Sequence, residues 1–156
     1  ELIQDSKTIK VIKVRNNRMN FSDFEFVLPA LGENSIIEEF YMSENNPMKE
    51  ESIDLIAKMI LMNRTIHTLY IDKIGLSLEN SRPFFLAMKK NVTIHILSLN
   101  DNPEVSVKKY VEFFKESTTI KKLNFMIRNS NVKRTKEELR LLEKFKAERS
   151  DIAFKY

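Results

Sequence analysis

Two histidines occupy matching places in two similar phrases of this sequence. "NRTIHTLYI" spans residues 63–71 and "NVTIHILSL" spans residues 91–99, so His67 and His95 are 28 residues apart. On adjacent strands the two imidazoles would lie close enough to share a zinc ion, but structural zinc sites almost always have four protein ligands. Glu38 offers a third ligand only by reaching across from another strand. The sequence therefore predicts no metal site, and the matching places of the histidines point to an internal repeat.

Other residue patterns that carry chemistry are missing as well. The chain has no cysteine, and its two glycines, Gly32 and Gly75, cannot form a glycine-rich phosphate loop. No Ser-His-Asp arrangement, zinc signature or carboxylate pair outside the helix surfaces stands out. We therefore expect a protein that is not an enzyme, with no catalytic residues and no cofactor.

Composition and charge narrow the class of partner. The 156 residues are 42% apolar and 31% charged, with a formal net charge of +4, as is typical of a folded, soluble protein. No apolar run approaches the ~20 residues that cross a bilayer. Glutamates dilute the basic residues of 131–149, which form no basic stripe with interleaved aromatic residues. Membrane and nucleic-acid partners are not expected. The absence of cysteine fits a reducing compartment, and we expect the cytoplasm.

A pattern of apolar residues recurs along the chain at nearly constant spacing. Its form is Ile-x-x-φ-x-φ, where φ is apolar, and successive anchor isoleucines are 28, 29, 28 and 26 residues apart. A partial last repeat near residue 149 places Ile152 and Phe154 29 residues after Leu123 and Phe125. Periods of about 20–50 residues are typical of solenoids, in which no single repeat buries its own apolar face. The anchors are Ile9, Ile37, Ile66, Ile94 and Ile120.

This pattern resembles the leucine-rich repeat, in the longer unit of the ribonuclease-inhibitor type, over essentially the whole chain. The resemblance implies an α/β fold. It would be a right-handed solenoid of about five to six repeats, with a parallel sheet on the concave face and helices on the convex face. We expect one domain over residues 1–156, as a fragment of a longer protein. Ile74 and Arg128 stand where the family has its turn asparagine, which predicts looser turns there.

The segments between these strand patterns read independently as helices. Apolar stripes with helical spacing predict helices within 51–63, 81–91 and 105–117. Thr135 and Glu138 form the capping-box pattern at the start of a helix over 135–145. Pro29 lies inside the segment 22–34, where an interior proline costs ~3 kcal/mol. We therefore expect the first helix to be short, kinked or restarted at Pro29.

Strand geometry selects the residues that would meet a partner. The fourth and sixth positions of each repeat point into the core, so the third, fifth and seventh face outward on the concave side. Tyr41 and Tyr70 hold the fifth position of adjacent strands and should stand side by side, and tyrosine is enriched at binding hot spots. Basic ends and an acidic, aromatic middle favour a protein ligand. The predicted partner-binding residues are Lys13, Arg15, Glu39, Tyr41, Thr68, Tyr70, Asp72, Ser98, Asn100 and Lys122.

Three functions are compatible with such a scaffold. The first is a non-catalytic interaction module that holds a protein partner on its concave face. The second follows from a closer resemblance in layout, including the phrase "NRTIHTL", to the C-terminal domain of tropomodulins and leiomodins. That resemblance implies actin binding near the slow-growing filament end, but it carries over no functional residue. The third is a GTPase-activating or other regulatory role, implied by the same repeat type in the activator of Ran. The C-terminal strand edge can pair if it is uncovered. Either a longer parent protein continues beyond it, or something else covers it, and self-association of two copies is one such cover.

Overall fold

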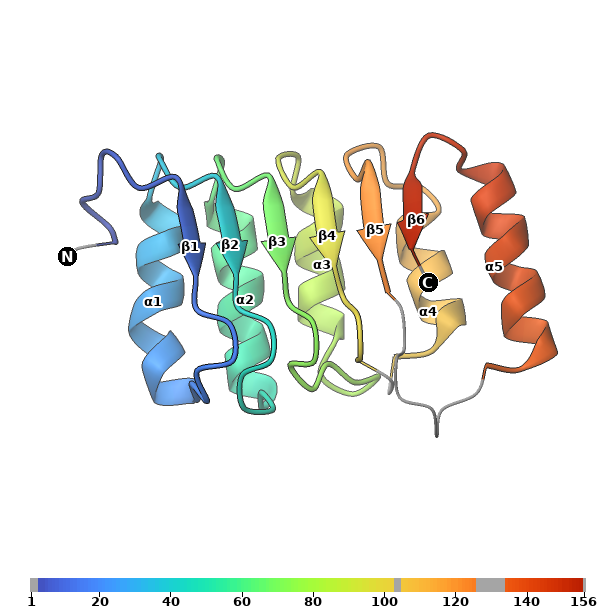
Figure 1. The fold of residues 1–156 in the computed structure, drawn as a ribbon, viewed down its shortest axis with the longest axis horizontal. Coiled ribbons are helices and arrows are strands. Elements are labelled where there is room, and N and C mark those ends of the chain that lie inside the picture. Colours follow the sequence, from blue (N-terminus) through green and yellow to red (C-terminus); the bar gives the residue numbers. More distant parts are fainter. Residues whose placement is uncertain (1–2, 103–104, 126–133, 156) are drawn as a thin grey trace.

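The computed structural model describes residues 3–102, 105–125 and 134–155. Within these ranges, six short parallel strands form one sheet in chain order, and a helix follows each of the first five strands. Figure 1 shows the strands side by side in front of the helices. This is the layout of a leucine-rich repeat, as predicted. The elements are β1 (Val11–Lys13), α1 (Phe21–Glu33), β2 (Glu39–Tyr41), α2 (Glu50–Met62), β3 (Thr68–Tyr70), α3 (Arg82–Lys90), β4 (Ile96–Ser98), α4 (Val107–Phe114), β5 (Lys122–Asn124), α5 (Lys136–Glu148) and β6 (Ala153–Lys155).

The middle residues of the strands build the spine of the core. Leu69, Leu97 and Leu123 pair with one another in register along the sheet, and each has 0% of its surface exposed. Phe40 extends this row on the side of β2, and it is equally buried. Each such burial stabilises the fold by about 1.5–3 kcal/mol. The apolar spine predicted from the repeat is therefore confirmed.

The sixth repeat copy is present, but its register differs from the prediction. The sequence spacing aligned Phe154 with Phe125, whereas Phe154 pairs with Leu123 in the structure. A shift of two residues keeps the same side chains on the same face of a strand, because side chains alternate with a period of two. Phe154 accordingly packs against the core beside Phe145 of α5, with ring centroids 5.0 Å apart.

The anchor isoleucines are buried in every repeat except the first. Ile37, Ile66, Ile94 and Ile120 have at most 1% of their surface exposed, whereas Ile9 is 44% exposed. Ile9 precedes β1, which pairs with β2 on one side only within the described residues. An anchor is covered by the repeats on both sides of it, so a residue at the edge of the sheet stays accessible.

The first helix runs through its proline. α1 is one continuous helix of 13 residues with Pro29 inside it, so the prediction that it is short or restarts at Pro29 is wrong. A proline removes the bond to the carbonyl of the residue four places earlier, here Glu25. Pro29 and Glu25 are both exposed, so water can take the place of the lost donor. Asn20 and Asp23 form a capping box that secures the helix start.

The other four helices occupy the segments predicted for them, but they are unevenly spaced. α1 packs closely on α2, and α2 on α3, whereas α3 and α4 make no comparably close approach. Gly32 lies at the first contact, where a Cβ would be 3.4 Å from Cβ of Met62, an ordinary van der Waals distance. Aromatic rings of Phe85 and Phe113 stand between α3 and α4 instead. No described helix is long and apolar enough to cross a bilayer.

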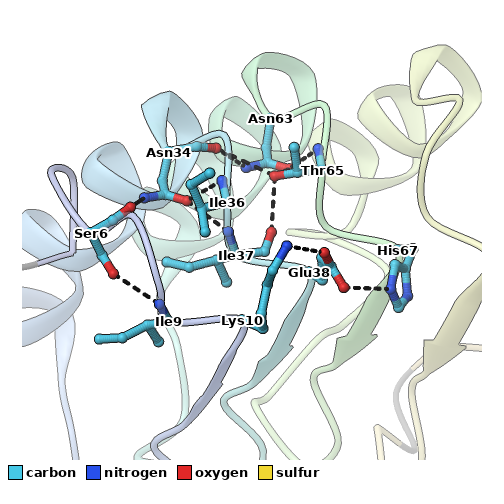
Figure 2. A network of polar contacts seen from close by, with 10 residues as sticks. All are labelled: Ser6, Ile9, Lys10, Asn34, Ile36, Ile37, Glu38, Asn63, Thr65 and His67. Atoms are coloured by element: carbon cyan, nitrogen blue, oxygen red, sulfur yellow. Dashed lines mark hydrogen bonds and ion pairs between the residues drawn. The ribbon is translucent and has the colours of Figure 1, made fainter.

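Buried asparagines at the helix ends join neighbouring repeats. The side-chain nitrogen of Asn63 donates to the carbonyl oxygens of Leu31 and Asn34, at 2.7 and 3.0 Å. Its oxygen accepts from the backbone nitrogens of Thr65 and Ile66. Asn34 takes the same place one repeat earlier, as Figure 2 shows. We call Asn34, Asn63 and Asn91 the asparagine row.

Asn102 bonds to the turn at Ile74, which the sequence predicts to be looser than in the family. Ile74 lacks the turn side chain of the family, but its backbone nitrogen and that of Leu76 donate to Oδ1 of Asn102, at 3.2 and 3.1 Å. The carbonyl of Ile74 also accepts from the backbone nitrogen of Met48, at 2.7 Å. The next repeat therefore holds the backbone at Ile74, the looser turn stays a prediction there, and Arg128 lies outside the described residues.

Candidate binding face

We call the side of the sheet away from the helices the open sheet face. Strand pairing places Glu39 beside Thr68 and Tyr41 beside Tyr70. Lys122 stands in the same row as Glu39 and Thr68, two strands further along. Because the strands are parallel and in register, the third and fifth positions of successive repeats form continuous rows, as the sequence predicts. The structure thus brings the predicted residues of β1 to β5 onto one surface.

The centre of this surface is a pair of stacked tyrosines. The ring centroids of Tyr41 and Tyr70 are 4.7 Å apart, with 28° between the planes. Both side chains are half-buried, so part of each ring is accessible to solvent. Nζ of Lys13 lies 5.0 Å from the Tyr41 centroid, over the ring. Stacking and the nearby cation favour this arrangement of the two rings.

A carboxylate on the same strand orients Tyr41. The hydroxyl of Tyr41 donates a hydrogen bond to Oε2 of Glu39, at 2.6 Å. This bond raises the pKa of Tyr41 to about 12, with smaller contributions from burial and from the charge of Glu39. The phenol therefore stays protonated across the physiological pH range. The side chain of Tyr41 therefore carries no charge on the open sheet face.

Four of the predicted contact residues lie beneath the surface. Thr68, Asp72, Ser98 and Asn100 have between 0% and 7% of their surface exposed. All four side chains are short, and little of their surface is accessible to solvent. Direct contact with a partner is therefore an expectation for the other predicted residues, which are Lys13, Arg15, Glu39, Tyr41, Tyr70 and Lys122.

The buried polar residues form a connected network under the face. Oδ1 of Asp72 accepts from Oγ of Ser98 at 2.6 Å and from the backbone nitrogen of Asn100 at 2.7 Å. The backbone nitrogen of Asp72 donates to Oγ of Ser43, at 2.9 Å. Hydrogen bonds to a charged acceptor are stronger than neutral ones. The network therefore ties β2, β3 and β4 together at the ends from which their turns begin.

An open hollow of about 290 Å³ lies on the open sheet face beside this network. Lys122 and Lys155 line it, and neither has an ion-pair partner within the described parts of the chain. Arg15 also lines the hollow and is 3.4 Å from Oε1 of Glu44. The hollow is therefore richer in positive than in negative side chains. Its lining residues are Arg15, Tyr70, Asp72, Asn100, Lys122, Asn124, Ala153, Phe154 and Lys155.

The sequence prediction missed the contribution of the last strand to this hollow. Lys155 stands beside Asn124 in the fifth-position row. Outward positions were assigned only for the five full repeats, and the sixth copy was expected as a partial repeat, so Lys155 was not assigned to the face. The alternation of Ala153, Phe154 and Lys155 around one apolar residue is the signal from which Lys155 could have been found.

Charged residues line the edge of the sheet where the strands begin. Glu38 contacts Nζ of Lys10 on one side, and its Oε2 lies 3.8 Å from Nε2 of His67 on the other (Figure 2). The hydrogen bond from Lys10, with smaller contributions from His67, lowers the pKa of Glu38. All three side chains are between 40% and 55% exposed. Surface pairs of this kind contribute little to stability.

His67 and His95 have separate partners. Nδ1 of His67 is 2.9 Å from Oγ1 of Thr68, and Nδ1 of His95 is 3.1 Å from the carbonyl oxygen of Thr119. Among the described residues, no three histidine, cysteine or acidic side chains are arranged so that they could hold a metal ion. The matching places of the histidines follow from the repeat, because both precede a strand by one residue.

Comparison with known proteins supports the fold. No protein-family model matches the chain, and no curated protein matches it. Among solved structures, the chain is similar to "Leiomodin-1 Actin-Binding Site 2 (ABS2)", with a TM-score of 0.76 and 17% sequence identity. The alignment covers 96% of this chain and 86% of that one. At this identity the similarity shows a shared leucine-rich-repeat fold.

Proposed function

We propose that this chain is a non-catalytic interaction module that binds a protein partner on its open sheet face. The observation that carries the proposal is the Tyr41–Tyr70 stack, with centroids 4.7 Å apart. Two half-buried aromatic rings offer a large contact area whose rotamers are already fixed, so binding costs little side-chain entropy. Lys13 and Glu39 flank the stack and supply charges of both signs for orienting a partner.

The test replaces both tyrosines by alanine. We expect Tyr41→Ala with Tyr70→Ala to weaken partner capture by about tenfold or more, because hot-spot aromatic residues carry a large share of binding energy. The measurement is quantitative affinity capture from a lysate of the source cells, with wild-type and variant proteins as parallel baits. Circular dichroism and the thermal midpoint establish that the variant is folded.

The matched control removes an aromatic ring elsewhere. Phe26 of α1 is 77% exposed and lies on the helix layer, so Phe26→Ala should capture the same proteins as wild type. Equal capture by the double tyrosine variant and by wild type would remove the open sheet face from the proposal. Loss of capture in Phe26→Ala alone would move the binding surface to the helices.

Actin is the second candidate as a named partner. The similarity of this fold to a leiomodin domain described as an actin-binding site favours it. Titration of labelled monomeric actin with the chain tests direct binding, and elongation from filaments with blocked fast-growing ends tests an effect at the slow-growing end. We expect saturable binding that the double tyrosine variant loses. The absence of both binding and any effect on elongation would discard actin and leave the general proposal open to other proteins.

A further inference from the structure

The side chains of the fifth-position row become short towards the C-terminal end of the sheet. In strand order from β3 to β6, the row holds Tyr70, Ser98, Asn124 and Lys155. Serine and asparagine are much smaller than tyrosine and lysine, so the row leaves space between Tyr70 and Lys155. The hollow of about 290 Å³ lies there, since Tyr70, Asn124 and Lys155 all line it.

The acidic residue that lines this hollow is bonded to donors of the sheet itself. Oδ1 of Asp72 accepts from Oγ of Ser98 and from the backbone nitrogen of Asn100, at 2.6 and 2.7 Å. Asp72 is only 7% exposed, so little of its carboxylate is accessible to a ligand. Arg15 likewise has a carboxylate of its own, because its Nη2 lies 3.4 Å from Oε1 of Glu44.

The remaining charged groups of the hollow are two lysines without counter-charge. Lys122 and Lys155 are both exposed, and neither has an ion-pair partner within the described parts of the chain. Lys155 pairs with Asn124, which is two residues after Lys122 on β5. The two lysine Cα atoms are therefore roughly 8 Å apart on a diagonal, given the usual strand separation and rise per residue. Like charges at this separation repel each other, and anions between them relieve the repulsion.

The diagonal between the two lysines matches the geometry of an extended peptide. Alternate side chains of an extended segment point to the same face and are roughly 6.5–7 Å apart. Two carboxylates separated by one residue therefore have nearly the spacing of Lys122 and Lys155. Ammonium groups donate charge-assisted hydrogen bonds to carboxylates. The charge and the spacing of the lysines together favour an acidic segment in extended form.

We propose that the hollow binds an extended acidic segment of the protein partner, in which two carboxylates separated by one residue pair with Lys122 and Lys155. This inference rests on the proposed function, because it uses the open sheet face, and it adds the chemistry of the partner. Tyr70 lines the hollow and also belongs to the tyrosine stack. The bound segment therefore lies beside the stack, and one partner contacts both.

The probe is a short fluorescein-labelled peptide in which glutamate alternates with serine, titrated with the whole chain and followed by fluorescence anisotropy. We expect saturable binding that weakens as salt is added, because ion pairs at an exposed surface are screened. A peptide of the same composition, arranged as repeats of Glu-Glu-Ser-Ser, has no two glutamates separated by one residue. It should bind at least about threefold more weakly, because neighbouring side chains of an extended segment point to opposite faces.

The decisive variant reverses the charge of the hollow. We expect Lys122→Glu with Lys155→Glu to weaken the alternating peptide at least about tenfold, and to bind the same peptide with lysines in place of glutamates better than wild type does. The matched control is Lys58→Glu with Lys108→Glu, which makes the same change in net charge at exposed positions of α2 and α4. Its affinities should stay within about twofold of wild type, because distant surface charges are screened.

Circular dichroism and the thermal midpoint establish that each variant is folded. If the charge-reversed variant fails to fold, Lys122→Gln with Lys155→Gln removes the charges without adding repulsion and should weaken the alternating peptide about threefold or more.

The proposal is overturned if wild type shows no saturable binding, if the two arrangements of glutamate bind alike, or if the lysine variants bind as wild type does. It is also overturned if a single-stranded oligonucleotide of equal charge binds as tightly, because the hollow would then accept any polyanion. These failures are distinct from failure of the proposed function. Loss of partner capture in the double tyrosine variant supports the open sheet face whether or not the acidic peptide binds.

Discussion

The side chain of Asn63 connects two neighbouring repeats: its Nδ2 lies 2.7 Å from the carbonyl oxygen of Leu31, 32 residues earlier. Asn63 is 2% exposed, so water cannot replace this bond without opening the helix layer. Its Oδ1 holds the chain that leads into β3, at the backbone nitrogen of Ile66. One carboxamide therefore closes a helix of the preceding repeat and starts a strand of its own.

Replacing this asparagine should destabilise the whole sheet. Asn63→Ala leaves buried donors and acceptors without partners, each costing about 1–3 kcal/mol, so we expect the free energy of unfolding to fall by about 2 kcal/mol or more. Urea denaturation followed by circular dichroism measures it. Asn17→Ala is the control, because Asn17 is exposed and its side chain donates only to the carbonyl of Arg15. Equal losses in both variants would contradict the role given to the buried row.

The apolar spine of the sheet gives a second prediction about stability. Leu97 has 0% of its surface exposed and lies between two other leucines of the row. Leu97→Ala should cost about 2–5 kcal/mol, because burial is lost and the rigid neighbours leave a cavity. Leu78→Ala serves as the control, since Leu78 is 54% exposed and should change stability by no more than about 0.5 kcal/mol. A loss under about 1 kcal/mol at Leu97 would show that the spine relaxes around the cavity.

The hydrogen bond between Tyr41 and Glu39 gives a prediction for alkaline pH. The pKa of Tyr41 is raised to about 12 from an ordinary value of 10.0. A raised pKa means that the bond stabilises the fold fully below about pH 10 and that this contribution is lost as the pH rises towards 12. Glu39→Gln removes the charge, so we expect the pKa of Tyr41 to move back towards 10.

Ultraviolet absorbance of the phenolate measures this titration, and Tyr41→Phe identifies which transition belongs to Tyr41. Tyr110 also titrates late, because its burial raises its pKa, but Glu39→Gln should not move that transition. An unchanged titration in Glu39→Gln would mean that burial of the ring, and not its carboxylate partner, controls the pKa of Tyr41.

The sequence was sufficient to predict those parts of the fold that repeat. The spacing of apolar residues predicted which strands pair and which leucines form the spine, because a one-residue slip would turn every apolar side chain to solvent. The Tyr41–Tyr70 contact followed from the same register. The regular part of the candidate face was therefore accessible from the sequence.

The features that sequence reasoning missed depend on single residues outside the pattern. Pro29 is tolerated because its side of α1 is exposed, and exposure within a helix depends on which neighbours pack there. A pocket between α3 and α4 lies beside the stacked rings of Phe85 and Phe113, and Ser117 lines it where the earlier repeats have an asparagine. The burial of Ser98 is likewise a property of the assembled sheet.

The last prediction concerns the contact that closes the end of α4. Arg149 makes two 2.8 Å bonds to the carboxylate of Asp151, and its Nη1 donates to the carbonyls of Phe114 and Lys115, at 2.7 and 3.0 Å. The hydrogen bonds from Arg149 lower the pKa of Asp151 to about 2, from 3.8. A lowered pKa means that the pair stabilises the fold above about pH 4, and that this contribution is lost as the pH falls towards 2.

Replacing Asp151 should therefore remove part of the loss of stability at low pH. We expect Asp151→Asn to be less stable than wild type at neutral pH, and the difference to shrink as both proteins are taken from about pH 5 to about pH 2. Thermal midpoints across this range measure the two curves. Arg149→Ala should be less stable than Asp151→Asn at every pH, because it also leaves two carbonyls at the end of α4 without their donor. A constant difference between wild type and Asp151→Asn down to pH 2 would mean that Asp151 does not titrate with this pair.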